Sequence, residues 1–417
     1  MKVCVLGLGY IGLPSSVMFA SHNCSVTGVD SSKDIVEIIN EGQVHIEEPG
    51  LKDLLQTCIK NKTFIAKEEP IKSDVFIIAV PTPYINDAFR RCDLQYVETA
   101  VRNIIPYLQP DNVVIIESTM APRSTEDYIK PILEEAGFTI GKNIYLAHCP
   151  ERVLPGNILN ELQYNHRIVG GITKACAQRA SNVYSCFVKG DIIKTDAKTA
   201  EMAKCIENTY RDLNIAFANE IVKISSELEL NCLEVIELAN LHPRVNIMKP
   251  GPGVGGHCLA IDPYFVYAKA PKQAQLIKLA RDINCSMAYF VVDIVKHLLP
   301  DIDSKIAALG ITYKGNVDDL RESPALIIIQ LLKNLGYHVD IHDSHVQRKD
   351  CVSFQEAVHN ADMCIVLTDH DEYKCLNHKS MKEQMKGDWL FDTRAIVASQ
   401  EGSGLKIVNF GNFYKYK

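Results

Sequence analysis

The chain has 417 residues, 47% of them hydrophobic and 23% charged, which is ordinary for a globular protein of two or three domains. Its formal net charge of −7 argues against a general nucleic-acid binder or a protein that coats anionic membranes. No apolar run approaches the about 18 residues of a membrane-spanning helix, so we expect neither a membrane segment nor a leader peptide. The 14 cysteines show no CxxC pair and no metal-ligand spacing, which predicts unpaired thiols, no metal site and a cytoplasmic location.

The N-terminal residues have the pattern of a dinucleotide-binding unit. A strand is predicted over residues 2–6, followed by Gly7-Leu-Gly-Tyr-Ile-Gly12, a helix over 11–20 and a strand over 25–29 that ends at Asp30. The first glycine permits a tight turn, the second lets a pyrophosphate approach the helix N-terminus, and the third allows close helix–strand packing. The carboxylate of Asp30 repels a 2′-phosphate, so we predict NAD rather than NADP, with FAD as the main alternative cofactor.

Two further predicted strands, 75–80 and 113–116, end in short polar turns that contain Thr82 and Thr119. Ligands of open parallel sheets bind beyond the carboxyl ends of the strands, so both threonines are placed to contact the cofactor. The alternative is that they cap the helices that follow.

Glu151 follows another predicted strand, 144–147, in a loop that also contains Pro155. Because proline restricts the backbone, this loop is expected to hold the Glu151 carboxylate in one place. Glu151 is therefore a candidate site residue.

The middle of the chain is predicted to be helical, with one helix over residues 199–230 and a second over 273–298. Apolar residues fall on more than one side of the first helix: Met202, Ile206, Leu213, Ile215, Phe217, Ile221, Val222 and Ile224. A helix that is apolar nearly all round is buried, so we expect it to pack on both domains and against a second subunit. Lys204, Asn208 and Arg211 share one face, either as a solvated polar stripe or as a source of acid–base chemistry.

Residues 250–265 form a glycine-rich run with one cysteine, Cys258, four residues before Asp262. Glycines let a ligand approach main-chain N–H groups, and a thiol becomes a nucleophile where positive charge or backbone dipoles stabilise the thiolate. The alternative is a surface loop in which a cysteine packs as a small apolar residue.

The C-terminal third predicts a second doubly wound α/β unit that lacks the tight glycine motif. Strands are expected over residues 305–309, 338–342, 363–367 and 389–391, and Gly336 ends a helix that covers 325–335. Lys314 and Arg321 follow the first of these strands, where two cations suit a phosphate. The predicted fold class is α/β, with two doubly wound Rossmann-like domains joined by a long central helix.

Ordered blocks along the chain carry a family resemblance. They are Gly7-x-Gly-Tyr-Ile-Gly12, Pro81-Thr-Pro83, Ser118-Thr119, Pro150-Glu-Arg152, Lys204-x-x-x-Asn208, Gly253-x-Gly-Gly-His-Cys258 with Asp262, and Lys314 through Arg321-Glu-Ser-Pro324. With these blocks the chain resembles the UDP-glucose/GDP-mannose dehydrogenase superfamily, the UDP-sugar 6-dehydrogenases, over nearly its full length. The resemblance implies an NAD domain (1–190), a central helical region through which a homodimer forms (191–300) and a UDP-sugar domain (301–417).

The resemblance also implies the chemistry, a four-electron oxidation of a sugar C6 alcohol to a carboxylate with two NAD+. Cys258 forms a thiohemiacetal and then a thioester, and Glu151 activates the water that hydrolyses it. Lys204 and Asp262 manage protons, and Lys204 with Asn208 stabilises an oxyanion.

Further site residues are carried over from the matching blocks. Those implied for the cofactor are Gly7, Gly9, Tyr10, Ile11, Gly12, Asp30, Thr82, Thr119 and Arg321, and Thr119 is also implied in catalysis. Those implied for the substrate are Glu151, Arg152, Val153, Lys204, Asn208, Arg211, His242, Arg244, Gly255, Tyr313 and Lys314.

The sequence after the cysteine bears on which sugar is oxidised. The UDP-glucose branch typically has Pro-Lys-Asp there, whereas this chain has Leu259-Ala-Ile-Asp262 and no lysine. The His242-Pro-Arg-Val-Asn246 block resembles the UDP-N-acetylmannosamine dehydrogenases, and losing a cation suits a neutral 2-acetamido group, to which His242 can hydrogen-bond. Such an enzyme makes precursors of cell-surface polysaccharide. The alternatives are UDP-N-acetylglucosamine or UDP-glucose as substrate, a two-electron NAD dehydrogenase, and a non-catalytic nucleotide-binding scaffold.

Overall fold

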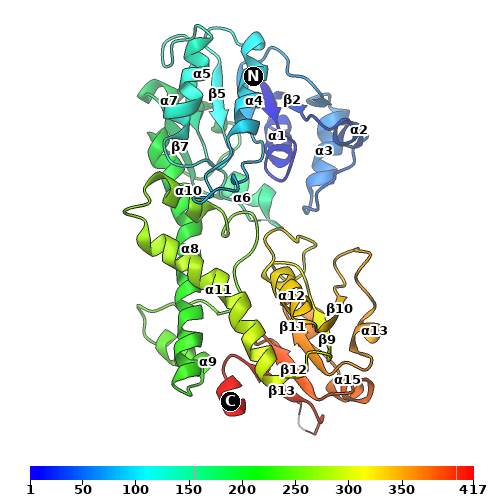
Figure 1. The fold of residues 1–417 in the computed structure, drawn as a ribbon. Coiled ribbons are helices and arrows are strands. Elements are labelled where there is room, and N and C mark those ends of the chain that lie inside the picture. The colour runs from blue at the N-terminus through cyan, green and yellow to red at the C-terminus, as the bar shows by residue number, and fades with distance from the viewer. Residues whose placement is uncertain (155, 401) are drawn as a thin grey trace. The chain divides into compact units, whose positions relative to one another are not determined.

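The computed structural model describes residues 1–154, 156–400 and 402–417, and its contacts divide the chain into two compact units (Figure 1). The first unit comprises Met1–Glu207 and Tyr264–Pro271, and the second comprises Asn208–Pro263 and Lys272–Lys417. The sequence predicted three domains, and that division remains a prediction. Pro155, expected to stiffen the loop after Glu151, lies outside the described residues.

The first unit is built on an eight-stranded sheet of order β3-β2-β1-β4-β5-β6-β7-β8, in which only the β6–β7 pair is antiparallel. The strands are β1 (Lys2–Leu6), β2 (Ser25–Val29), β3 (Phe64–Lys67), β4 (Val75–Ile78), β5 (Val113–Ile116), β6 (Tyr145–His148), β7 (Arg167–Gly171) and β8 (Ile192–Asp196). The strand order reverses between β1 and β4. In open α/β sheets the crevice beyond the carboxyl ends of such a strand pair is where ligands bind.

Helices surround this sheet, and some of them begin at a side-chain cap. They are α1 (Gly12–Ser21), α2 (Lys33–Asn40), α3 (Leu51–Lys60), α4 (Gln95–Ile104), η1 (Ile105–Tyr107), η2 (Thr125–Ile129), α5 (Lys130–Glu135), α6 (Ile158–Tyr164) and α7 (Lys174–Tyr184). The Ser32 hydroxyl accepts the Ile35 N–H at the start of α2, and the Thr173 hydroxyl accepts the Cys176 N–H at the start of α7. All residues of β4 and β5 are buried, so these strands form the centre of the core.

The long helix predicted for the middle of the chain is α8 (Ala197–Glu227), which follows β8 directly. Part of this helix is exposed in the single chain, so the expected packing against a second subunit stays a prediction. Phe217 is 52% exposed and Ile224 is 50% exposed, and of the eight apolar residues that suggested burial only Val222 is fully buried. One face of α8 packs in its own chain, and the opposite apolar face meets solvent.

The second unit contains a five-stranded parallel sheet of order β10-β9-β11-β12-β13. Its strands are β9 (Lys305–Leu309), β10 (His338–His342), β11 (Met363–Val366), β12 (Trp389–Asp392) and β13 (Lys406–Asn409). Its helices are α9 (Cys232–Asn240), α11 (Gln275–Leu298), α12 (Pro324–Leu335), α13 (Phe354–Val358), α14 (Asp371–Lys374), α15 (His378–Gln384) and η3 (Phe413–Tyr416), while α10 (Asp262–Lys269) begins here and continues into the first unit. Gly336 ends α12 with φ +109°, as predicted.

The predicted α/β class with two doubly wound sheets and a long helix between them in the chain is confirmed. Within the described part of the chain, no helix is both long and apolar enough to cross a membrane.

Candidate functional site

The glycine motif after β1 forms a tight loop at the switch point of the first sheet. Gly7 has φ +90°, and a β-carbon there would lie 2.6 Å from the Ala79 carbonyl oxygen that follows β4. A β-carbon at Gly12 would lie 1.8 Å from the Gly7 carbonyl oxygen, so α1 packs directly on the turn. Nothing lies within 4 Å of a β-carbon placed at Gly9. The loop thus leaves open space at the glycine expected to face a pyrophosphate.

Asp30 is fixed against the same loop from the end of β2. One carboxylate oxygen accepts the Leu8 N–H at 3.0 Å, and the other accepts the Ser32 N–H at 3.0 Å. Of the other residues expected at the cofactor, Tyr10 is exposed and Ile11 immediately precedes α1. The structure therefore holds a carboxylate beside the glycine loop, where a ribose hydroxyl can donate to it.

Thr82 and Thr119 follow β4 and β5, and neither caps the next helix. The residue before α4 is Leu94, and the residue before η2 is Ser124. The Ser118 hydroxyl donates to the Val80 carbonyl oxygen at 2.7 Å, which ties the two turns together. The capping alternative is thereby excluded for both threonines, because the helices start too far along the chain.

Glu151 belongs to a buried charged cluster that the sequence did not reveal. The Arg167 guanidinium lies 2.8 Å from Glu117 and 2.9 Å from Glu151, with both carboxylates buried. The same guanidinium lies over the Tyr184 ring at 4.0 Å and donates to the Cys149 sulfur at 3.2 Å. One cation thus lies between two carboxyl groups, and the Arg152 N–H also donates to Glu151 at 2.7 Å. The Glu151 carboxylate is held in place by these contacts.

Burial shifts the protonation equilibria of this cluster. It raises the pKa of Glu117, an effect that Arg167 opposes and Glu151 reinforces. It also raises the pKa of the Cys149 thiol to about 11, which keeps that sulfur protonated and unreactive. The sequence signal for the cluster was weak, because Arg167 is an isolated cation at the start of a strand that we did not predict.

Lys204 and Arg152 belong to the part of the first unit where α8 begins. His148, at the end of β6, is 0% exposed, and burial together with the Lys204 charge lowers its pKa to about 3. His148 is therefore neutral and adds no positive charge beside Lys204. The Arg152 guanidinium pairs with Glu207 of α8 at 2.6 Å.

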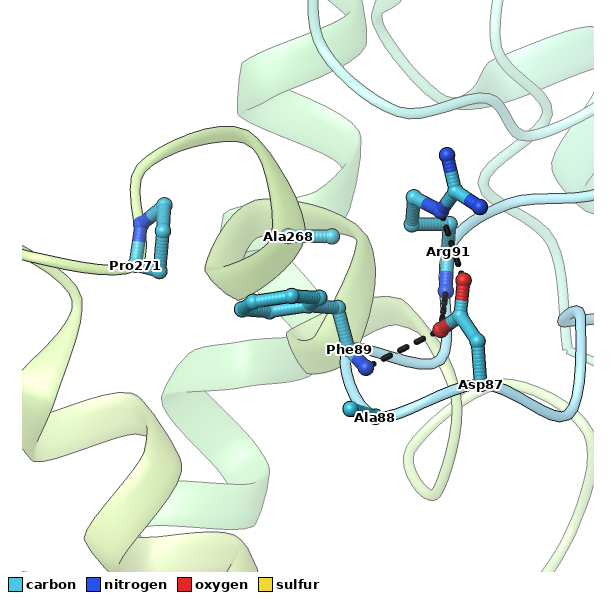
Figure 2. A pocket seen from close by; sticks show the side chains of 6 residues that line it. All are labelled: Asp87, Ala88, Phe89, Arg91, Ala268 and Pro271. Carbon is cyan, nitrogen blue, oxygen red and sulfur yellow. Dashed lines mark hydrogen bonds and ion pairs between the residues drawn. The ribbon is translucent and has the colours of Figure 1, made fainter.

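A pocket of about 450 Å³ lies on the long loop after β4 (Figure 2). Figure 2 shows the Phe89 ring beside Ala268 and the Asp87–Arg91 ion pair, whose Oδ2–Nε distance is 2.6 Å, on one side of the pocket. No residue predicted for the site is among those that line it.

In the second unit, the cysteine loop joins three predicted residues. The Asn208 side-chain amide donates to the Asp262 carboxylate at 2.6 Å, and the Asp262 N–H donates to the Cys258 carbonyl oxygen at 2.9 Å. Asn208 and Asp262 are buried, whereas Cys258 is half-buried. The structure thus fixes the orientation of the carboxylate and the amide that the sequence placed 54 residues apart.

A chain of buried polar groups anchors the start of this loop. The Gly251 N–H donates to the Asn219 side-chain oxygen at 2.9 Å, and the Asn219 amide donates to Asn284 at 2.9 Å. The Asn284 amide donates to Asp212 at 2.7 Å, and Arg281 donates to the same Asp212 oxygen at 2.6 Å. Helices α8 and α11 therefore hold the loop through its backbone, a role that sequence spacing could not reveal.

Tyr313 packs against the glycines that precede Cys258. A β-carbon at Gly255 would lie 2.7 Å from the Tyr313 β-carbon, and one at Gly256 would lie 2.8 Å from the Tyr313 ring. These two positions therefore require glycine. The Gly256 N–H also donates to the Arg321 carbonyl oxygen at 2.9 Å.

The remaining polar residues predicted for the substrate lie at the surface. Lys314, Arg211, His242 and Arg244 are exposed. Arg321 is exposed as well, but its guanidinium pairs with Asp319 at 2.6 Å, so its charge is already balanced in the second unit. The Val153 side chain is half-buried in the first unit.

A second pocket, of about 330 Å³, lies beyond the carboxyl ends of β12 and β13. Its lining includes the cations Lys249 and Arg394 and the apolar residues Ile236, Ile247 and Phe410. We did not predict this pocket. The available signal was Arg394, a cation directly after a strand, because ligands of open sheets bind beyond strand ends.

Three domain families match the chain in sequence order. All belong to the UDP-glucose/GDP-mannose dehydrogenase family, with the NAD binding domain over residues 1–188, the central domain over 198–286 and the UDP binding domain over 307–399.

Relatives extend the similarity over the whole chain. A UDP-N-acetyl-D-mannosamine dehydrogenase of Methanocaldococcus jannaschii is 45% identical, over 99% of this chain and 96% of the relative. An NDP-N-acetyl-D-galactosaminuronic acid dehydrogenase of Ralstonia nicotianae is 40% identical, over 95% of this chain and 96% of the relative. A solved structure of the UDP-N-acetyl-mannosamine dehydrogenase Cap5O from Staphylococcus aureus superposes with a TM-score of 0.93 at 48% identity, and 100% of each chain is covered.

Proposed function

Because the chain belongs to the UDP-glucose/GDP-mannose dehydrogenase family, we propose that it oxidises UDP-N-acetyl-D-mannosamine at C6 to UDP-N-acetyl-D-mannosaminuronate. Family membership makes it an NAD-dependent UDP-sugar dehydrogenase. The observation that carries the choice of sugar is the full-length similarity to UDP-N-acetyl-D-mannosamine dehydrogenases. The open space at Gly9 and the Asp30 carboxylate fixed beside the glycine loop suit NAD.

The covalent chemistry is assigned to Cys258. The glycine loop and Asp30 would hold NAD, which would supply the hydride acceptor, with one NAD+ used in each of the two oxidation steps. The Cys258 thiolate adds to the aldehyde carbon to give a thiohemiacetal, and loss of the second hydride leaves a thioester. Water then attacks the acyl carbon, the thiolate leaves, and the product carries a C6 carboxylate.

Proton transfer is assigned to the fixed polar groups. Asp262 and Lys204 take up the protons released in the oxidations, and the Asn208 amide, already oriented by its bond to Asp262, stabilises an oxyanion. Glu151 removes a proton from the hydrolytic water. Its contacts with Arg167 and the Arg152 N–H support this role, because they hold the carboxylate in one orientation.

The nucleotide is assigned to the second pocket. The UDP binding domain match covers Arg394, and the lining combines two cations and one acid, Glu237, with an apolar wall. Lys249 and Arg394 suit a diphosphate, and Ile236, Ile247 and Phe410 suit the faces of a base and a ribose. The Arg394 guanidinium is paired with Asp369 at 3.0 Å, which orients it and balances its charge, so Lys249 is the cation left to attract the diphosphate.

A homodimer is assigned to the exposed apolar face of α8. Tyr210, Phe217 and Ile224 recur every seven residues, which places them on one stripe, and each is at least half exposed. Exposed apolar stripes of this kind mark interfaces. Light scattering should return twice the mass of the chain, and Phe217→Glu should shift the protein to the monomer. A monomeric wild-type enzyme would contradict the assignment.

The decisive experiment is a substrate panel followed by NADH absorbance. UDP-N-acetylmannosamine, UDP-N-acetylglucosamine, UDP-N-acetylgalactosamine and UDP-glucose are offered separately with NAD. We expect the mannosamine sugar to give the highest kcat/KM, with about two NADH per sugar consumed. One NADH per sugar would support a two-electron dehydrogenase, and preference for another sugar would overturn the substrate. The galactosamine arm tests the activity named for the Ralstonia relative.

A further inference from the structure

His370 is buried at the carboxyl edge of the second sheet, outside every group assigned above. It follows β11, is 0% exposed, and stacks on the His345 ring at a centroid distance of 4.4 Å. A buried histidine at a strand end invites the interpretation of a metal ligand, since His345, His370 and Glu372 lie near one another. Its hydrogen bonds point to a different role.

Both ring nitrogens of His370 already have partners. Nδ1 accepts the Asn316 N–H at 2.9 Å, so it carries no proton. Nε2 therefore carries the hydrogen, and it lies 3.1 Å from the Asp343 carboxylate and 3.2 Å from the Thr312 hydroxyl. Neither nitrogen has a lone pair left for a cation. The ring bridges the loop after β9, which contains Asn316, and the carboxylate after β10.

The neighbours of His370 hold the same loop. Asp369 accepts the Gly315 N–H at 3.1 Å. The Asn316 side-chain amide donates to the Asp371 carboxylate at 2.8 Å, and the Asp371 backbone N–H donates to the Asn316 side-chain oxygen at 3.0 Å. A β-carbon at Gly315 would lie 2.2 Å from the Asp369 carbonyl oxygen, so the two backbones are in close contact. The conformation of residues 312–316 is thus fixed by contacts with residues 369–371, which lie far along the chain.

This loop carries Tyr313, which links it to the nucleophile. The Tyr313 ring packs on Gly256, and its β-carbon packs near Gly255, two and three residues before Cys258. Any shift of the loop moves that ring, and the glycines have no side chains that could fill the gap. Displacements of about 1 Å in a catalytic group reduce rates by up to about 100-fold.

We propose that His370 is the positioning residue that fixes the loop 312–316 and, through the Tyr313 ring, the backbone that presents Cys258. The Nδ1–Asn316 bond is the essential one, because it holds the loop itself, whereas Nε2 only orients the imidazole on Asp343. The consequence for turnover rests on the proposed function of Cys258, but the consequence for loop order does not.

Two conservative variants separate the two bonds of the ring. In His370→Asn the side-chain oxygen stands near the position of Nδ1 and can still accept the Asn316 N–H, while the contact with Asp343 is lost. In His370→Gln the terminal amide reaches the position of Nε2 and can still donate to Asp343, while the acceptor for Asn316 is lost. His378→Gln is the matched control, since His378 is another buried histidine of the same unit, in α15.

Amide hydrogen exchange of the full-length protein measures how well the loop 312–316 is ordered, without any substrate. The peptide that contains Asn316 should exchange about tenfold faster in His370→Gln than in wild type, and near the wild-type rate in His370→Asn and His378→Gln. Unchanged exchange in His370→Gln, or equal loss in both His370 variants, would overturn the proposal.

Kinetics then test the link to the nucleophile. We expect kcat to fall at least about tenfold in His370→Gln, with the KM for NAD unchanged, and to be largely kept in His370→Asn. An equal fall of kcat in His378→Gln would mean that replacing any buried histidine of this unit reduces turnover, which would overturn the positioning role of His370. If wild type oxidises no sugar of the panel, the proposed function fails while the exchange result still decides the loop contact.

Discussion

Arg167→Met tests the buried cluster around Glu151. Methionine keeps most of the apolar stem of Arg167 and removes the guanidinium, which leaves Glu117 and Glu151 buried without their cation. Removing one partner of a buried ion pair costs about 3–5 kcal/mol. For a unit of this size about 1 kcal/mol corresponds to about 2–4 °C in melting temperature, so we expect Tm to fall by roughly 6–20 °C.

The sign of the pH dependence follows from the carboxyl groups. Burial already raises the pKa of Glu117 above its unfolded value, and Arg167 opposes that rise, so the variant should raise the pKa further. A carboxyl group with a raised pKa binds more protons in the folded state than in the unfolded state. Its contribution to stability is therefore lost as pH rises through the folded pKa. The deficit of Arg167→Met should be smaller at about pH 5 than at about pH 8.

Scanning calorimetry at both pH values measures this, with Arg179→Met as the control. Arg179 also pairs with an acid and lies over a tyrosine ring, but its Asp111 partner is exposed and 3.4 Å away. A surface pair of this kind contributes at most about 1 kcal/mol, so the control should melt within about 4 °C of wild type. The reasoning is refuted if Arg167→Met behaves like the control, or if its deficit is the same at the two pH values.

Three further predictions concern the reaction. Cys258→Ser should abolish steady-state NADH formation while calorimetry still detects UDP-sugar binding, because a hydroxyl is a far weaker nucleophile, and normal turnover would remove the covalent mechanism. Asp30→Ala should reduce the preference for NAD over NADP by about tenfold in kcat/KM, and unchanged discrimination would mean that Asp30 does not meet the ribose. Glu151→Gln should give a rapid burst of about two NADH per active site, then turnover slowed by about 100-fold or more, with an acyl group on the Cys258 peptide in mass spectra. Slow turnover without burst or adduct would place Glu151 before hydrolysis.

The central strands of the first sheet could be predicted because they are short, wholly apolar and followed by turn residues. β4 and β5 are buried along their whole length, and their sequences are continuous apolar runs, as expected for buried parallel strands. Gly7 and Gly336 end elements with positive φ, as their residue type indicates. The sequence of α8 did not separate the apolar residues that its own chain buries from those it leaves exposed, because an apolar face looks the same in sequence whether its own chain or a second copy covers it.

The site was less predictable because its partners are distant in sequence. Local spacing identified Cys258, Asp262 and Asn208 as candidates, but not the contact between Asn208 and Asp262. Arg167 gave no local sign that it neutralises Glu151, and His370 stands in a run of charged residues that reads as solvated surface. The roles of these two residues depend on which loops meet at one edge of a sheet. Strand order determines which loops meet there, and the spacing of residues along the chain does not reveal it.

The division of the chain into two units also constrains how the protein can be cut or recombined. The boundary between Glu207 and Asn208 falls inside the continuous helix α8, and the first unit takes Tyr264–Pro271 from later in the chain. Within that unit the Arg90 guanidinium lies over the Tyr264 ring at 4.8 Å. A fragment that stops at residue 207 would therefore end in mid-helix and lack the ring that its own loop packs against. A single crossover at the 207/208 boundary between two genes of this kind separates Arg90 from its native Tyr264. Exchange of the first unit as a whole therefore requires three crossovers, at 207/208, 263/264 and 271/272.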